Sequence, residues 1–189
     1  MWKIDSVSGS VPLSVAQAKT HLRVDHSDED SLIESFIAAA QNIVELYTGR
    51  KLQRSVVVEN VPYFEASIPL RWPIVTLTSV EYLPSGTDGS SYSSTSIYKI
   101  YESDDNRFIY QKADTTYPSV LSEKLPIKIT YSTGYADGEV PDALLQAMYL
   151  FIGRMYENRA DARELQQVST NIPTTAEYMM NPYRLNFYK

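Results

Sequence analysis

Apolar side chains recur at helical spacing in three parts of the chain, and each pattern predicts an amphipathic helix. The longest covers residues 28–48 and ends before Gly49, a residue typical of helix C-termini. Its apolar face comprises Leu32, Ile33, Phe36, Ile37, Ala40, Ile43, Val44 and Tyr47. This helix is the clearest element that the sequence predicts.

Two further helices are predicted on either side of a long central section. Near residues 13–23, Ser14 and Gln17 have the spacing of a capping box, which satisfies free backbone N–H groups at a helix start. Near residues 141–163, Pro141 suits the first helical position. The stripe of this last helix is Leu144, Ala147, Met148, Phe151, Ile152 and Met155.

Between residues 53 and 131, short runs of β-branched and aromatic residues replace the helical spacing. The runs are SVVVENV, TSVEYL, SIYKIYE, RFIYQK and IKITYS, and turn-forming stretches separate them. They predict an antiparallel β section, expected to be peripheral and to contact neighbouring molecules. Pro69 and Pro73 flank a piece that we expect to be an edge strand or a connector. The Ser-rich residues 90–96 are expected to form a hairpin tip.

These patterns together predict an α+β fold. A small helical bundle, with helices near residues 13–23, 28–48 and 141–163, carries the inserted β section and an extended C-terminal arm. We expect a single domain over residues 1–164, with its helical core in residues 12–50 and 140–164. The arm, residues 165–189, has no clear period, yet it contains apolar side chains that we expect to be exposed.

Composition excludes several classes of protein. The 189 residues include no cysteine, so a disulfide framework or a thiolate zinc site is impossible. No segment approaches the roughly 18 uninterrupted apolar residues that indicate a membrane span, so we expect a soluble protein without a membrane partner. The formal net charge is −6, and no basic stripe of the kind that marks a dedicated DNA binder is present.

Few residues are suited to catalysis or to binding a cofactor. His21 and His26 are the only histidines, and neither has an obvious nucleophile beside it. The acidic run DHSDED lacks the spacing and the glycine of a calcium loop. The glycines of TGYADG are better explained by a strand-to-helix turn than by phosphate binding. We therefore predict no catalytic residue, no metal and no cofactor, although a pair of carboxylates for glycoside hydrolysis stays open.

Four segments resemble the head–tail connector (adaptor) family of tailed bacteriophages. They are LSVAQAKTHLRVD, AAAQNIVELYTGR, YSTGYADGEVP and YENR, followed by a tail with NPYR. The similarity in the order of segments covers nearly the whole chain. In the tail, Met179 and Met180 stand where the family often has small residues and paired leucines.

The resemblance implies a non-enzymatic protein of the virion neck, assembled in the host cytoplasm. Adaptors of this family form a dodecameric ring beneath the portal, extend the DNA channel, and support the stopper (head-completion) or tail proteins. DNA passes through the lumen without sequence-specific binding. The C-terminal segment docks on the portal, and the candidate docking residues are Met179, Met180, Pro182, Tyr183, Arg184, Phe187 and Tyr188.

The charge agrees with a channel through which DNA slides. Twelve chains at −6 each would carry −72, and an acidic ring offers no cations to hold phosphates. The fifteen tyrosines suit a protein that buries its surface against copies of itself. Two alternatives stay open: a stopper or tail-completion protein of the same neck, and a carbohydrate-binding tail accessory that uses its aromatic residues.

A polar contact is expected where the third helix ends. At about 100° per residue, the stripe that starts at Leu144 continues through Asn158 and Arg159. The same projection from Leu32 places Glu29 on the apolar face of the second helix. If these helices pack antiparallel, Arg159 would bind Glu29 through a guanidinium–carboxylate pair, and Asn158 would finish the buried stripe.

Replacing Arg159 by Ala is therefore expected to lower the free energy of unfolding by roughly 1–3 kcal/mol, because Glu29 would be left without its partner. Glu157→Ala is the matched control, since its side chain points away from the stripe, and its effect should stay below about 0.5 kcal/mol. Urea unfolding of the two variants measures the difference.

Overall fold

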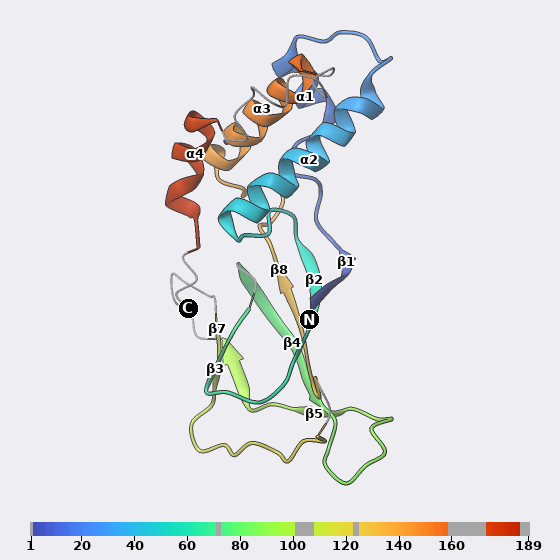
Figure 1. Cartoon of the computed structure of the whole chain (residues 1–189), viewed down its shortest axis with the longest axis vertical. Helices are drawn as coiled ribbons and strands as arrows, with labels where there is room; N and C mark the ends of the chain where they lie inside the picture. Colours follow the sequence, from blue (N-terminus) through green and yellow to red (C-terminus); the bar gives the residue numbers. More distant parts are fainter. Residues whose placement is uncertain (1, 71–72, 101–107, 123–124, 159–172, 186–189) are drawn as a thin grey trace, which may run out of the picture. The chain divides into compact units, whose positions relative to one another are not determined.

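The computed structural model describes residues 2–70, 73–100, 108–122, 125–158 and 173–185 (Figure 1). The chain divides into two compact units. The β unit consists of Met1–Ser10 and Gln53–Ala136, and the helical unit of Val11–Leu52 and Asp137–Lys189. The fold is α+β, as the sequence patterns predict.

The three predicted helices are confirmed, but the third ends at Glu157 and not near residue 163, because Asn158 leaves helical geometry. The helical unit contains α1 (Val15–Leu22), α2 (Asp30–Thr48), α3 (Asp142–Glu157), α4 (Thr174–Met180) and the 3₁₀ helix η1 (Asn181–Tyr183). The Ser14 side chain accepts from the backbone N–H of Gln17, whose own side chain accepts from the Ser14 N–H, completing the capping box. Gly49 ends α2 in the left-handed conformation, at a φ of +75°.

The helical core lies between α2 and α3, which run antiparallel, with α1 and α4 packed against α3 (Figure 1). The apolar faces predicted from periodicity supply it. Its fully buried side chains include Leu13, Ala18, Ile33, Ala40, Val44, Leu144, Ala147, Met148, Ile152, Ala176 and Met180. Burial of each large apolar side chain stabilises the fold by about 1.5–3 kcal/mol.

A buried carboxylate, which periodicity did not indicate, fixes the chain after α2. Glu45 Oε1 accepts hydrogen bonds from Gln41 Nε2 and from the backbone N–H of Leu52, each at 3.0 Å. Glu45 Oε2 forms an ion pair with Lys51 Nζ. The side chains of Glu45 and Lys51 are only 8% and 13% exposed. The carboxylate therefore ties the last turns of α2 to the residues that follow Gly49.

The described residues of the β unit form eight antiparallel strands in two sheets. The five-stranded sheet has the order β1-β2-β8-β4-β5 and the three-stranded sheet the order β3-β7-β6. The strands are β1 (Trp2–Val7), β2 (Ser55–Val61), β3 (Ser67–Pro69), β4 (Ile74–Tyr82), β5 (Ser93–Thr95), β6 (Tyr98–Ile100), β7 (Phe108–Gln111) and β8 (Ile127–Thr133).

The five predicted runs are all strands, and three strands were not predicted. β1, at the start of the chain, pairs with β2. β3 ends at Pro69 and lies at the edge of its sheet. Of the piece between Pro69 and Pro73, Leu70 is buried outside any strand, and residues 71–72 lie outside the described residues. β5 lies inside the Ser-rich stretch that we expected to be a hairpin tip, and it pairs with Val80–Tyr82 of β4. Serine has weak strand preference, so pairing with a neighbour rather than propensity decides this strand.

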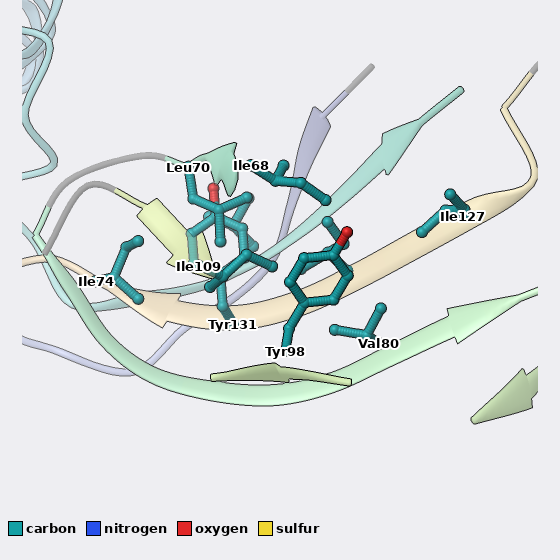
Figure 2. Packing of buried hydrophobic residues seen from close by; sticks show 10 residues of the cluster. Ile68, Leu70, Ile74, Val80, Tyr98, Ile109, Ile127 and Tyr131 are labelled. Carbon is teal, nitrogen blue, oxygen red and sulfur yellow. The ribbon is translucent and has the colours of Figure 1, made fainter. Parts of the chain in front are cut away.

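The core of the β unit lies between the two sheets, as Figure 2 shows. Strand β8 alternates buried and partly exposed positions along its length, as expected for a strand with one face in the core. The cluster comprises Val57, Ile68, Leu70, Ile74, Val80, Tyr98, Ile109, Ile127, Ile129 and Tyr131. Two of the tyrosines that could have formed an aromatic platform, Tyr98 and Tyr131, are thus packing residues.

The hydroxyl groups of these two buried tyrosines have partners. Tyr131 donates to Glu59 Oε2 at 3.0 Å. Tyr98 donates to the Glu65 carbonyl at 2.6 Å and accepts from the Glu65 N–H at 3.1 Å. Burial raises the pKa of Tyr98 to about 12. The phenol therefore stays protonated and keeps its donor role at any physiological pH.

A glycine shapes the connection that leaves β8. Gly134 has a φ of +101°, and a Cβ at this position would collide with the backbone of Gln53 and Arg54. The Gly134 N–H donates to the Pro73 carbonyl at 3.1 Å. Close backbone approach explains this glycine of the TGYADG stretch, in agreement with the interpretation of a turn.

None of the helices described in the chain is both long and apolar enough to cross a bilayer.

Substitution of Glu45 by Ala is expected to reduce the free energy of unfolding by about 3–5 kcal/mol, because Lys51 and the Leu52 N–H would lose their buried partner. Leu46→Ala is the matched control: its side chain is 84% exposed, so the change should stay within about 0.5 kcal/mol. Chemical denaturation of both variants checks this, and equal effects would contradict the role of Glu45.

Candidate docking surface on the C-terminal segment

The C-terminal segment, residues 173–185, packs on the helical unit. α4 lies against α3, and it also contacts α2. Ala176 and Met180 are fully buried, and Leu185 is 9% exposed. Exposed and half-buried residues separate these three buried ones along the chain, so one face of the segment packs inward and the other faces outward. We expected Met180 to be exposed, and this expectation is wrong, because a short amphipathic helix turns Met180 inward.

Hydrogen bonds join the segment to the last turn of α2. Tyr47 Oη lies 2.7 Å from Asn181 Oδ1 and 3.2 Å from Glu177 Oε1, and it donates to these acceptors. The Leu185 N–H donates to the Thr48 carbonyl at 2.8 Å. Arg50 Nε donates to the carbonyl of Tyr183. Four hydrogen bonds thus join the end of α2 and Arg50 to the C-terminal segment.

Two stacked cations accompany these bonds. The Arg184 guanidinium lies 5.1 Å from the centre of the Tyr47 ring, and that of Arg50 lies 5.6 Å from the centre of the Tyr183 ring. Such pairs contribute about 0.5–1 kcal/mol each at exposed sites. Burial, and then the hydrogen bond to Glu177, raises the pKa of Tyr47 above its ordinary value of 10.0. Tyr47 therefore remains a hydrogen-bond donor.

The outer face of the segment is open to a partner. Tyr178 is 73% exposed, and Asn181, Pro182 and Arg184 are exposed as well. Met179 and Tyr183 are half-buried. The structure thus brings Pro182, Tyr183 and Arg184 together on η1 and the residue after it. Phe187 and Tyr188 lie outside the described residues. Tyr178, which periodicity alone did not single out, is the most exposed aromatic side chain among the described residues of this face.

The described residues show a polar contact between Glu29 and the end of α3. Arg159 lies outside the described residues. Tyr156 Oη donates to Glu29 Oε2 at 2.6 Å, so Glu29 binds the last turn of α3 through this tyrosine, and its pairing with Arg159 stays a prediction. Lys19 Nζ, 2.7 Å from Asp30 Oδ1, ties α1 to the same end of α2.

Asn158 does not finish the buried stripe, and that expectation is wrong. α3 ends at Glu157, and Asn158 has left helical geometry, with φ −108° and ψ 49°. Its side chain is exposed, and its Nδ2 donates to the Arg154 carbonyl at 3.1 Å. The projection at 100° per residue assumed a helix that continues, whereas Asn158 caps its end.

The described residues offer little for catalysis. No group of three or more His, Asp or Glu side chains among them is placed to hold a metal ion. His21 stacks on Tyr149 with 4.7 Å between ring centres, so this histidine packs α1 onto α3. The surface features that the helical unit presents are those of binding: exposed aromatic and cationic groups on a segment held in place by its inner face.

The family comparison identifies the class of protein. A family model described as "Phage gp6-like head-tail connector protein" matches residues 12–113, more than half of the chain. The chain belongs to this family of structural connectors, which join the head of a phage to its tail. No match was found among curated proteins.

Solved structures show the same fold. A chain in the neck of an empty gene transfer agent particle, computed with C6 symmetry, superposes with a TM-score of 0.75 at 18% identity, covering 97% of this chain and 95% of that one. A chain of the native gene transfer agent virion gives 0.77 at 18%, with coverage of 97% and 95%. One from the native neck, computed with C12 symmetry, gives 0.72 at 17%, with 96% and 94%.

Tyr47→Phe removes the hydroxyl that joins α2 to the segment, and it should cost about 0.5–1.5 kcal/mol. Because the folded protein holds the Tyr47 proton more tightly, this contribution is complete below pH 10 and declines as the pH rises further.

Hydrogen exchange distinguishes this local contact from a general loss of stability. In Tyr47→Phe, the amides of α4 and of Leu185 should exchange faster, while those of α3 stay protected. Tyr178→Phe, which removes a hydroxyl from a side chain that is 73% exposed, is the control and should leave the segment unchanged. Uniform acceleration across the helical unit would contradict the assignment.

Proposed function

We propose that the protein is an adaptor subunit: copies of it form a dodecameric ring in the virion neck, between the portal and the stopper or tail proteins. The membership of the gp6-like head–tail connector family carries this proposal. It is supported by the fold shared over nearly the whole length with chains of gene transfer agent necks, one of them computed with C12 symmetry. The role is structural, and assembly takes place in the host cytoplasm.

The charge of the chain supports a lumen that lets DNA slide. At −6 per chain, a ring of twelve carries −72. Binding to DNA gains its strength from cations that displace the counterions of phosphates, and an acidic ring supplies few of them. DNA therefore passes without being held, and without sequence-specific binding.

The exposed face of the C-terminal segment is the proposed docking surface for the portal. It presents Tyr178, Pro182, Tyr183 and Arg184 on a backbone that the inner face holds in place. Tyrosine and arginine dominate the binding energy of protein interfaces, because each combines a large contact area with polar groups. Met180 supports this surface from inside, and Met179 is half-buried.

The burial of Ala176 and Met180 determines how portal docking should be tested. Deleting residues 172–189 would also expose the helical core, so lost binding could reflect lost folding. A single substitution on the outer face avoids this ambiguity. Tyr178→Ala changes a side chain that is 73% exposed, and Tyr63→Ala, 59% exposed in the β unit, is the matched tyrosine control.

Tyr178→Ala is expected to weaken binding to the portal protein of the same phage by about 30-fold, which corresponds to the roughly 2 kcal/mol of an interface hot spot. Tyr63→Ala should bind as the unaltered protein does, and both should keep the unfolding midpoint. Portal binding is measured by sedimentation of the mixed proteins. Undiminished binding by Tyr178→Ala would contradict the docking surface.

Electron microscopy of the purified protein with its portal tests the ring itself. A twelve-fold ring seated on the portal is the expected result. Binding to a tail or head-completion assembly but not to the portal would instead favour the stopper or tail-completion role.

A further inference from the structure

The five-stranded sheet of the β unit has two edges that the described residues leave open. β1 is the last strand on one side and pairs only with β2. On the other side, β5 covers only Val80–Tyr82 of β4, so residues 74–79 of β4 have β8 on one side and no described strand on the other. The backbone N–H and C=O groups along such edges are available to another strand.

β1 is held in the sheet by its backbone hydrogen bonds to β2, and its described side chains contribute little to the core of the β unit. All its side chains from Lys3 to Val7 are exposed, and these include Ile4 at 40% and Val7 at 53%. The open part of β4 likewise presents Val75, 40% exposed, together with the exposed Thr76 and Thr78. Both edges therefore carry β-branched side chains, which favour strand pairing. Residues 74–79 of β4 carry no charge, and β1 carries one exposed charge of each sign, Lys3 and Asp5.

The strand directions make these two edges complementary to each other. Each of β1, β2, β8 and β4 is antiparallel to its neighbour in the sheet, so β4 runs antiparallel to β1. A neighbouring copy related by a small ring rotation keeps its β1 nearly parallel to that of the first copy. Its β1 would therefore meet the open edge of β4 in the antiparallel sense that the whole sheet already uses.

A closed ring needs this kind of contact. Ring neighbours join through two different surfaces of the same subunit, whereas contacts between identical surfaces produce dimers. β1 and residues 74–79 of β4 are of similar length and lie at opposite edges of one sheet. Each of these strands also contains a bulge, which restricts the registers that a second strand can adopt.

We propose that β1 of one copy pairs with residues 74–79 of β4 in the next copy, so that the five-stranded sheets continue from subunit to subunit. This inference rests on the proposed ring and names the surfaces that close it. The partner is a second copy of this chain, since the two edges and their directions are supplied by the same sheet.

Cysteine cross-linking tests the pairing, and the absence of native cysteine gives a clean background. Ile4→Cys and Val75→Cys are prepared as separate full-length proteins, mixed in equal amounts, assembled with the portal protein, and treated with a short flexible bismaleimide. Leu46→Cys, on a side chain of the helical unit that is 84% exposed, replaces either partner as the control for random collision.

The mixture of Ile4→Cys and Val75→Cys should give cross-linked dimers at least about tenfold faster than mixtures with Leu46→Cys, because neighbours in a ring have a high effective concentration. A single protein carrying both cysteines should give a ladder of bands that extends toward the full ring.

Three results would overturn the pairing. The first is cross-linking no faster than the control although microscopy shows the ring, which leaves the proposed function intact. The second is cross-linking of Ile4→Cys or Val75→Cys alone as fast as in the mixture, since this indicates contacts between identical edges. The third is the absence of any ring from the unaltered protein with its portal, which removes the proposed function as well.

Discussion

The carboxylate of Glu45 lies inside the helical unit and joins groups that are otherwise separated by a change of chain direction. It accepts from Gln41 within α2 and from the Leu52 N–H beyond the helix, and it pairs with Lys51. Removing a charge from water is costly, so such a group is retained only where its partners are fixed. The chain after Gly49 therefore has one path, and the end of α2 becomes a rigid platform.

The C-terminal segment depends on that platform. Tyr47, Thr48 and Arg50 supply the hydrogen bonds that hold residues 177–185, and they lie between Glu45 and its partner Leu52. Few side chains of the segment are fully buried, and the remaining contacts are polar and partly exposed. A segment held in this way is fixed in position but buries fewer side chains than α2 and α3, which suits the docking role proposed for its outer face.

In the β unit, too, the residues that stabilise the fold are different from those that stay exposed at the sheet edges. Its core between the two sheets is apolar, and the buried hydroxyls of Tyr98 and Tyr131 are satisfied. The edges of the larger sheet carry exposed Ile4, Val7 and Val75. Interior packing thus holds the unit together without these edges, which leaves their backbone groups available for the pairing between copies proposed above.

The sequence by itself determined the elements whose signals are local. The apolar stripes of α2 and α3, the capping box of Ser14 and Gln17, the left-handed Gly49 and five of the strands follow from spacing and backbone preference. The segments that resemble the connector family likewise indicated the class that the family comparison confirms.

Only the tertiary structure decided which polar and apolar groups meet across the fold. Periodicity projected Asn158 onto the buried stripe, but the helix ends there and the residue is exposed. It treated Met180 as exposed, because a seven-residue helix has too few turns to show its period. It missed Glu45 and β1. A charge within a helix and a short strand whose side chains are exposed become structural only through distant partners, which are Lys51, Leu52 and β2. Those partners are supplied by the path of the folded chain, which local spacing does not encode.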